Sequence, residues 1–120
     1  MYVMLCTRHD LAYSISSLSQ FLSNPGPVHW KALMKVMKYV QATKHLSICY
    51  GGSQFANILE GYTDADWAGD IDTKRSTSGF VFLLNQGPIS WNSRKQTSVA
   101  LSSTESEYIA ATNATKEAIG

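Results

Sequence analysis

The hydrophobic pattern changes its period near residue 46, and this change limits the fold more than any other feature of the sequence. Upstream, Leu11, Ile15 and Leu18 recur at the spacing of one helix face, and residues 30–40 repeat that spacing. Downstream, short segments rich in β-branched and aromatic residues are separated by Gly, Pro, Asn and Asp, a pattern typical of strands and turns. The sequence therefore predicts helices first and a sheet afterwards, in an α+β fold.

Two breaks divide the chain into segments. Residues 23–28 read SNPGPV and residues 50–54 read YGGSQ, and both stretches are strong turn signals. We expect a helical hairpin within a first segment at 1–50 and a separate second segment at 51–120. Because 44% of the 120 residues are hydrophobic, the chain has enough apolar surface for a core.

The second segment contains the candidate strands of one antiparallel sheet. They are residues 46–50, 57–65, 79–85 and 88–94. The sequence LNQGPIS, between the last two, is a hairpin signal. We therefore expect three or four strands.

A C-terminal helix is expected to follow the sheet. Overlapping capping boxes mark its start, and the first pairs Ser102 with Glu105. Its expected packing face consists of Tyr108, Ala111, Thr115 and Ile119. The predicted order is a helical hairpin, a three- or four-stranded sheet and one helix.

The charge of the chain does not by itself indicate a nucleic-acid partner. Ten Lys and Arg residues against nine Asp and Glu residues give a formal charge of +1, so such a partner would be held by local patches. Lys31, Lys35 and Lys38 form a stripe on the second expected helix, although an ordinary solvated helix face also explains this stripe. The cations that flank the expected hairpin are candidates for contacts with backbone phosphates: Lys74, Arg75, Arg94 and Lys95.

Cysteine usage and the N-terminus indicate the compartment. Cys6 and Cys49 are isolated thiols without metal-ligand spacing, which favours reduced cysteines in an intracellular protein. The first residues lack the basic start and apolar run of a signal peptide, and no apolar run reaches the roughly 18 residues of a membrane span. We expect a cytoplasmic or nuclear protein without a membrane partner. Secretion would require an upstream signal outside this chain.

Residues 60–70, EGYTDADWAGD, place acidic side chains at the end of an apolar strand. An unpaired buried carboxylate is costly, so this charge needs a partner. Asp64 at a strand end and Glu105 in the first turn of a helix can converge on one point, and carboxylate oxygens suit Mg²⁺. Two simpler roles stay open: Asp64 can accept hydrogen bonds from backbone amides, and Glu105 can complete the helix cap.

Four motifs follow one another in the chain: EGYTDADWAGD, KRSTSGFVFLL, GPISWNSRKQ and ALSSTESEYIAAT. In this order they resemble the ribonuclease H domain of copia-type retrotransposon polyproteins. Residues 7–44 are similar to the segment just upstream of that domain, at the C-terminal end of the reverse transcriptase. The likeness covers nearly the whole chain, with His9 and Ala42 standing where that family usually has proline and glycine.

The resemblance implies a truncated ribonuclease H-like fold. In that family four carboxylates hold two Mg²⁺ ions and hydrolyse the RNA strand of an RNA·DNA hybrid. The resemblance matches Asp64 and Glu105 to two of these catalytic metal ligands, and the other two would follow Glu117 in segments that this chain lacks. Because Mg²⁺ demands a near-octahedral set of ligands, we expect little or no nuclease activity from this chain alone.

The same resemblance implies an exposed edge on the strand at 57–65. Open apolar edges recruit partners or aggregate. We therefore expect a homodimer, pairing with residues 46–50, or pairing with the missing C-terminal half of the domain.

Two non-enzymatic alternatives stay open. Copia-like fragments are sometimes named as secreted RxLR effectors that modulate host immunity, although the sequence contains no Arg-x-Leu-Arg string. The chain can also act as a nucleic-acid-binding module that uses its basic residues without cleavage.

Overall fold

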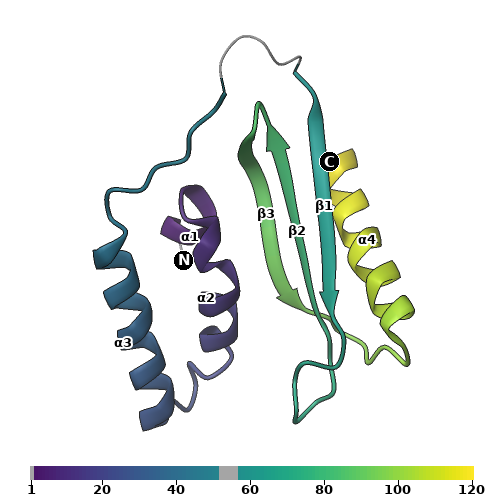
Figure 1. Ribbon diagram of the computed structural model, residues 1–120. Helices are drawn as coiled ribbons and strands as arrows, with labels where there is room; N and C mark the ends of the chain where they lie inside the picture. The colour runs from purple at the N-terminus through teal and green to yellow at the C-terminus, as the bar shows by residue number, and fades with distance from the viewer. Residues whose placement is uncertain (1, 52–56) are drawn as a thin grey trace. The chain divides into compact units, whose positions relative to one another are not determined.

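The described chain divides into two units. The computed structural model describes residues 2–51 and 57–120, and its units are Met1–Ile48 and Cys49–Gly120. The boundary expected at residues 50 and 51 lies two residues downstream of this division. Figure 1 labels the helices and strands of both units.

The first unit consists of helices, as its hydrophobic spacing predicts. They are α1 (Tyr2–Cys6), the 3-10 helix η1 (His9–Leu11), α2 (Ala12–Ser19) and α3 (Pro27–Ala42). Pro27 is the first residue of α3. A backbone N–H at this position would have no intrahelical acceptor, so proline costs the helix no hydrogen bond. Gly26 donates its N–H to His29 Nδ1 at 2.9 Å. Because α2 and α3 contact each other, the expected helical hairpin is confirmed.

A polar cluster joins the start of this unit to the end of α3. Arg8 donates to the Asp10 carboxylate at 3.0 and 2.8 Å, and to Thr43 Oγ1 at 2.7 Å. Tyr39 donates its hydroxyl to Asp10 at 2.8 Å. The hydrogen bonds from Arg8 are the main reason that the pKa of Asp10 is lowered to about 2. The ionised carboxylate is therefore the form that stabilises the folded unit.

This cluster is expected to make the first unit less stable in acid. The folded pKa of Asp10 lies below its ordinary value of 3.8, so its contribution is complete above about pH 4 and is lost as the pH falls through about 2. We expect Asp10→Asn to lower the melting temperature at about pH 6 and to change it little at about pH 2. Thermal unfolding followed through the amide signals of α2 and α3 measures the melting temperature at each pH. If Asp10→Asn lowered the melting temperature equally at the two pH values, the effect would come from packing and not from charge.

The second unit contains a three-stranded antiparallel sheet in the order β1-β2-β3. β1 is Leu59–Asp66, β2 is Thr77–Leu84 and β3 is Gly87–Lys95. Asn85 and Gln86 have φ values of 50° and 66°, the positive values that a type I′ turn requires. The hairpin predicted from LNQGPIS is therefore confirmed, and so is the α+β class.

The last helix, α4 (Ser103–Ile119), packs on one face of β1 and β2 (Figure 1). Its predicted cap is confirmed, because Ser102 Oγ accepts the N–H of Glu105 at 3.1 Å. The predicted packing face is wrong, since Tyr108 is 72% exposed and Ile119 is 82% exposed. The buried row is Ser106, Ala110 and Ala114. Small side chains along this row allow α4 to approach the sheet closely, whereas Tyr108 and Ile119 point outward.

Residues 46–50 form no strand, so pairing of β1 with this segment is wrong. The end of the segment contacts the β2–β3 turn instead. Gly51 donates its N–H to the carbonyl of Asn85 at 2.7 Å, and Tyr50 donates its hydroxyl to the carbonyl of Pro88 at 3.1 Å. Among the described residues, β1 pairs with β2 alone and its other edge is open.

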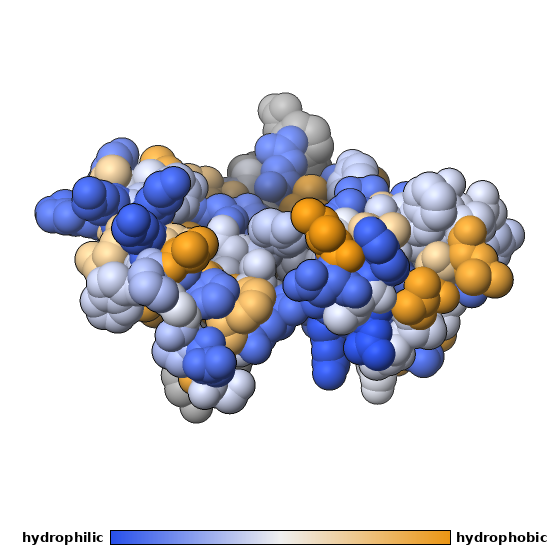
Figure 2. Space-filling model, turned by 90° about the horizontal axis from the view of Figure 1, so that it is seen from below, coloured by the Kyte–Doolittle hydropathy of each residue, from blue (hydrophilic) through white to orange (hydrophobic). Residues whose placement is uncertain are grey.

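Apolar side chains also reach the surface of the second unit. Ile71 is 80% exposed and Leu101 is 86% exposed. Figure 2, which views the molecule from below, shows separate orange patches on a largely blue and white surface. Within residues 2–51 and 57–120, no helix combines the length and the hydropathy that crossing a bilayer requires.

Candidate functional site

The end of β1 and the start of α4 lie next to each other in the second unit. Trp67, which follows β1, donates its indole N–H to the carbonyl of Ala100, just before α4, at 3.2 Å. Within the loop after β1, Ala68 donates its N–H to the hydroxyl of Ser76 at 3.1 Å, and Ser76 is fully buried. The first bond joins the two loops and the second closes the loop after β1. The two acidic segments singled out in the sequence are therefore neighbours.

The strand register determines the side of the sheet from which Asp64 projects. Gln96 Nε2 donates to Ser78 Oγ at 2.8 Å and to the carbonyl of Ser106 in α4 at 2.9 Å, so Ser78 faces α4. Ser78 pairs directly with Ala65. Directly opposed residues share a face of the sheet, and successive residues alternate between faces. Ala65 therefore faces α4, and Asp64 projects from the opposite face.

Glu105 closes the start of α4. Its carboxylate accepts the N–H of Leu101 at 2.7 Å, while its own N–H donates to Ser102 Oγ at 3.1 Å. A carboxylate in the first turn also interacts favourably with the helix dipole. Glu105 thus has the capping role that the sequence left open, but its side chain reaches one residue further upstream than an ordinary capping box requires.

The carboxylate oxygens of Asp64 and Glu105 suit Mg²⁺ chemically, but their arrangement does not fit a shared ion as it stands. Asp64 projects from the face away from α4, and the Glu105 carboxylate is bonded to Leu101. Across the part of the chain that the structure describes, no three His, Cys, Asp or Glu side chains are grouped to hold a metal ion. A shared ion would require Glu105 to leave its cap.

Glu107 is a further acidic residue of α4, and the sequence did not favour it as a site residue because it lies two positions after Glu105 on the helix. Ser106 and Ala110 mark the helix face that packs on the sheet. Ile109 and Lys116 lie to one side of that face, where they line a groove beside β3. At about 100° per residue, Glu107 falls on the other side, toward β1. Its place directly after the buried Ser106 is informative only once the packing face is known.

Two acidic residues, one at the end of β1 and one in the loop that follows, have local contacts. The Asp66 carboxyl lies against Gly69, where any side chain would collide with it. Asp70 accepts from Lys95 at 2.6 Å and also from the hydroxyl of Thr73. The hydrogen bond from Lys95, followed by that from Thr73, lowers the pKa of Asp70 to about 2. Lys95, one of the expected phosphate contacts, is therefore already paired with a carboxylate.

The other expected cations are exposed: Lys31, Lys35, Lys38, Lys74, Arg75 and Arg94. The first three lie along α3 in the first unit, and the other three lie in the second unit, in the loop before β2 or near the end of β3. None of the six forms an ion pair with another described residue. Their charge is available to an anionic partner.

Comparison with known proteins finds relatives that match most of this chain. It is 51% identical over 119 residues to the secreted RxLR effector protein 161 of Plasmopara viticola, covering 99% of this chain and 83% of the relative. It is 50% identical over 119 residues to the retrovirus-related Pol polyprotein from transposon TNT 1-94 of Nicotiana tabacum, covering 99% of this chain and 9% of the relative. It is 42% identical over 111 residues to the Pol polyprotein from transposon RE2 of Arabidopsis thaliana, covering 92% and 8%. No protein-family model and no solved structure matches the chain.

These relatives differ greatly in length. The chain spans 83% of the protein named as an effector, but only 9% and 8% of the two Pol polyproteins. The polyprotein matches extend over the same motifs that carry the resemblance in the sequence, so that resemblance is confirmed. This chain belongs to the family of retrovirus-related Pol polyproteins from copia-type transposons.

Proposed function

We propose that the second unit is part of a ribonuclease H-like domain, which in a full-length polyprotein acts on RNA·DNA hybrids. The bond from Trp67 to the Ala100 carbonyl carries this proposal, because it joins the acidic end of β1 to the acidic start of α4. Asp64 and Glu105 stay the metal ligands that the family resemblance implies, on the condition that Glu105 leaves its cap when an ion binds, and Glu107 is the acidic residue of α4 to compare with Glu105.

The chain of 120 residues is expected not to cleave hybrids by itself. Asp64 and Glu105 supply only two of the four carboxylates that the family resemblance implies, and Mg²⁺ dehydrates reluctantly for an incomplete set of ligands. We expect no cleavage above background when the purified chain and Mg²⁺ are incubated with a hybrid whose RNA strand is labelled. Mg²⁺-dependent cleavage that disappears in Asp64→Asn would contradict this expectation and would establish Asp64 as a ligand.

Manganese in place of magnesium tests the proposed ligands without requiring catalysis. Bound Mn²⁺ broadens the amide signals of nearby residues, and we expect this broadening at the end of β1 and the start of α4. Asp64→Asn should weaken Mn²⁺ binding by at least about tenfold, because it removes a charged oxygen ligand. The comparison of Glu105→Gln with Glu107→Gln identifies which carboxylate of α4 takes part. Asp72→Asn, in the exposed loop, is the matched control, and an Asp64→Asn protein that binds Mn²⁺ like this control would exclude Asp64.

The lysine stripe on α3 favours a second role in binding, since its exposed lysines have no described acidic partner. Replacing Lys31, Lys35 and Lys38 together by Gln is expected to weaken hybrid binding and to reduce the slope of log affinity against log salt by about 2 to 3. Fluorescence anisotropy at several salt concentrations measures this slope. Lys44→Gln, exposed and just beyond α3, is the control. If the triple variant and the control had the same slope, the three lysines would be excluded from the binding interface.

The similarity to a protein named as a secreted effector does not favour a separate function, because the same residues match the transposon polyproteins. A cytoplasmic or nuclear location stays a prediction. A homodimer or another chain segment on the open edge of β1 also stays a proposal, which the oligomeric state in solution would test.

A further inference from the structure

A groove in the second unit lies between α4 and β3, apart from the proposed metal ligands. α4 packs mainly on β1 and β2, so the part of that sheet face formed by β3 is left uncovered. The groove has a volume of about 400 Å³, which is in the range of small-molecule sites. We call it the β3 groove.

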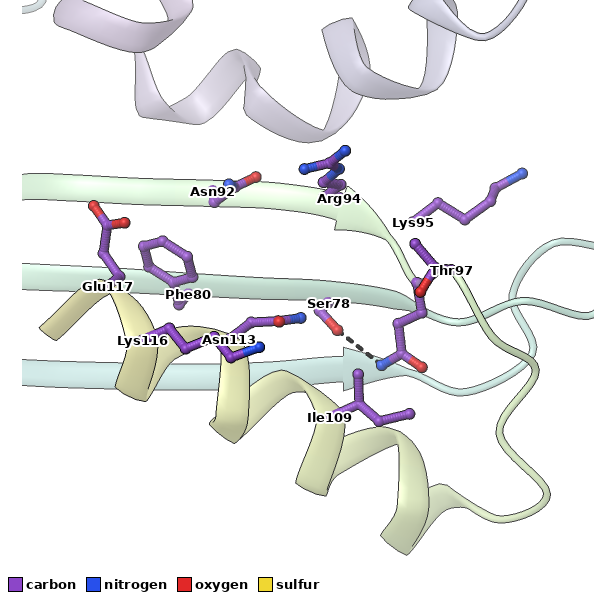
Figure 3. A pocket seen from close by; sticks show the side chains of 11 residues that line it. Ser78, Phe80, Asn92, Arg94, Lys95, Thr97, Ile109, Asn113, Lys116 and Glu117 are labelled. Carbon is purple, nitrogen blue, oxygen red and sulfur yellow. Dashed lines mark hydrogen bonds between the residues drawn. The ribbon is translucent and has the colours of Figure 1, made fainter. Parts of the chain in front are cut away.

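The residues of the β3 groove come from two strands and one helix. Figure 3 shows Phe80 of β2 between Asn92 and Arg94 of β3 on one side and Asn113 and Lys116 of α4 on the other. The dashed line in Figure 3 marks the hydrogen bond from Gln96 Nε2 to Ser78 Oγ. The groove therefore combines an aromatic ring, amide groups and cations in one place.

Two cations of the β3 groove are not neutralised within the described residues. Arg94 and Lys116 form no ion pair there, whereas Lys95 is paired with Asp70 at 2.6 Å. The acidic residue that lines the groove, Glu117, accepts a hydrogen bond from the Ser90 hydroxyl at 2.7 Å. With Lys95 paired, the groove carries two unpaired cations against the one carboxylate of Glu117, and this excess of positive charge favours an anionic group.

The β3 groove also has a buried acceptor without a donor. Gln96 lines the groove and is 4% exposed. Its Nε2 group donates to Ser78 and to the Ser106 carbonyl, but its Oε1 atom accepts no hydrogen bond from any described residue. An unsatisfied buried oxygen is costly, but this atom is itself closed to solvent, so the acceptors open to an entering ligand are the exposed side-chain amides of Asn92 and Asn113.

We propose that the β3 groove binds a nucleotide. Its phosphate would interact with Arg94 and Lys116, its sugar or base would pack against the Phe80 ring, and its hydroxyl or amino donors would reach the amide oxygens of the groove. A simple anion would use only the cations. This inference goes beyond the proposed function, since it involves neither Asp64 nor Glu105 and requires no metal ion.

The test is a titration of the whole chain with adenosine 5′-monophosphate in the presence of EDTA, followed by amide and side-chain NMR signals. We expect shifts at the side-chain amides of Asn92 and Asn113, and weaker effects from adenosine alone or from inorganic phosphate alone. Identical affinity for inorganic phosphate and for the nucleotide would overturn nucleotide recognition, and no shift with any of the three would overturn the site. The dinucleotide ApA extends the test: tighter binding than the mononucleotide assigns the groove to a nucleotide within a strand, and weaker binding assigns it to a free nucleotide.

Matched variants locate the site. Arg94→Gln and Lys116→Gln should each weaken binding of adenosine 5′-monophosphate by about tenfold, because each loses a charge-assisted hydrogen bond. Lys44→Gln, which changes an exposed lysine outside the groove, should bind as the unchanged protein does. Amide spectra of the free variants establish that they are folded. Equal binding by Arg94→Gln and Lys44→Gln would contradict the proposal. Because EDTA removes free metal ions, this result is independent of the Mn²⁺ experiment.

Discussion

Replacing Gln96 by alanine is expected to lower the free energy of unfolding of the second unit by about 2 to 3 kcal/mol. Gln96 is 4% exposed, and its Nε2 group donates to Ser78 Oγ at 2.8 Å and to the Ser106 carbonyl at 2.9 Å. Alanine would leave both acceptors without this donor, and an unsatisfied buried polar group costs about 1 to 3 kcal/mol. Since these bonds join β2 to α4, their loss should loosen the helix on the sheet.

Two further variants separate hydrogen bonding from side-chain size. Gln96→Glu keeps the shape but replaces the donor by a carboxylate, so at neutral pH it should be at least as destabilising as Gln96→Ala. Thr97→Ala changes the next residue, which is exposed, and should alter stability by less than about 0.5 kcal/mol. Urea unfolding followed through the amide signals of β2 and α4 measures the free energy of unfolding of all three variants. If Gln96→Ala proved as stable as Thr97→Ala, the two bonds would make no net contribution.

Replacing Ala110 by leucine is expected to destabilise the second unit by about 1 to 3 kcal/mol through overpacking. Ala110 is 1% exposed and lies in the middle of the buried row of α4. A leucine there has no free volume at the contact between helix and sheet, so α4 must move outward. That movement would also lengthen the bond between Gln96 and the Ser106 carbonyl, which is 2.9 Å long.

Ala118→Leu is the matched control for this prediction. Ala118 lies on the same helix but is exposed, so leucine there should change stability by less than about 0.5 kcal/mol. Urea unfolding gives the stability difference, and amide hydrogen exchange along α4 shows whether the helix itself is loosened. If Ala110→Leu and Ala118→Leu exchanged at the same rates and were equally stable, the buried row would not be close-packed.

The elements that sequence reasoning predicted correctly depend on residues close together in the chain. The β2–β3 turn follows from Asn85 and Gln86, because a type I′ turn requires two adjacent positive φ values. The start of α4 follows from Ser102, whose hydroxyl accepts the N–H of Glu105 three residues later. Such signals act within one turn of chain and need no knowledge of the fold.

The packing of α4 could not be read in the same way. The large apolar residues Tyr108 and Ile119 suggested a packing face, but the structure buries Ser106 and Ala110 instead. Hydrophobic spacing measures which side chains avoid water, whereas the contact between helix and sheet here selects side chains small enough for close approach. The bond from Gln96 to the Ser106 carbonyl contributes to that selection, and no sequence pattern indicates it.

The family, the division into helices and sheet, and the acidic residue types at the end of β1 and the start of α4 can all be read from the amino-acid sequence. The directions of these side chains depend on long-range packing, which turns Asp64 away from α4 and Glu105 into its helix cap. This packing also left the face of β3 beside α4 uncovered, which forms the groove at Arg94 and Lys116. Residue chemistry is local, whereas the direction of a side chain depends on strand register and on the face that a helix buries.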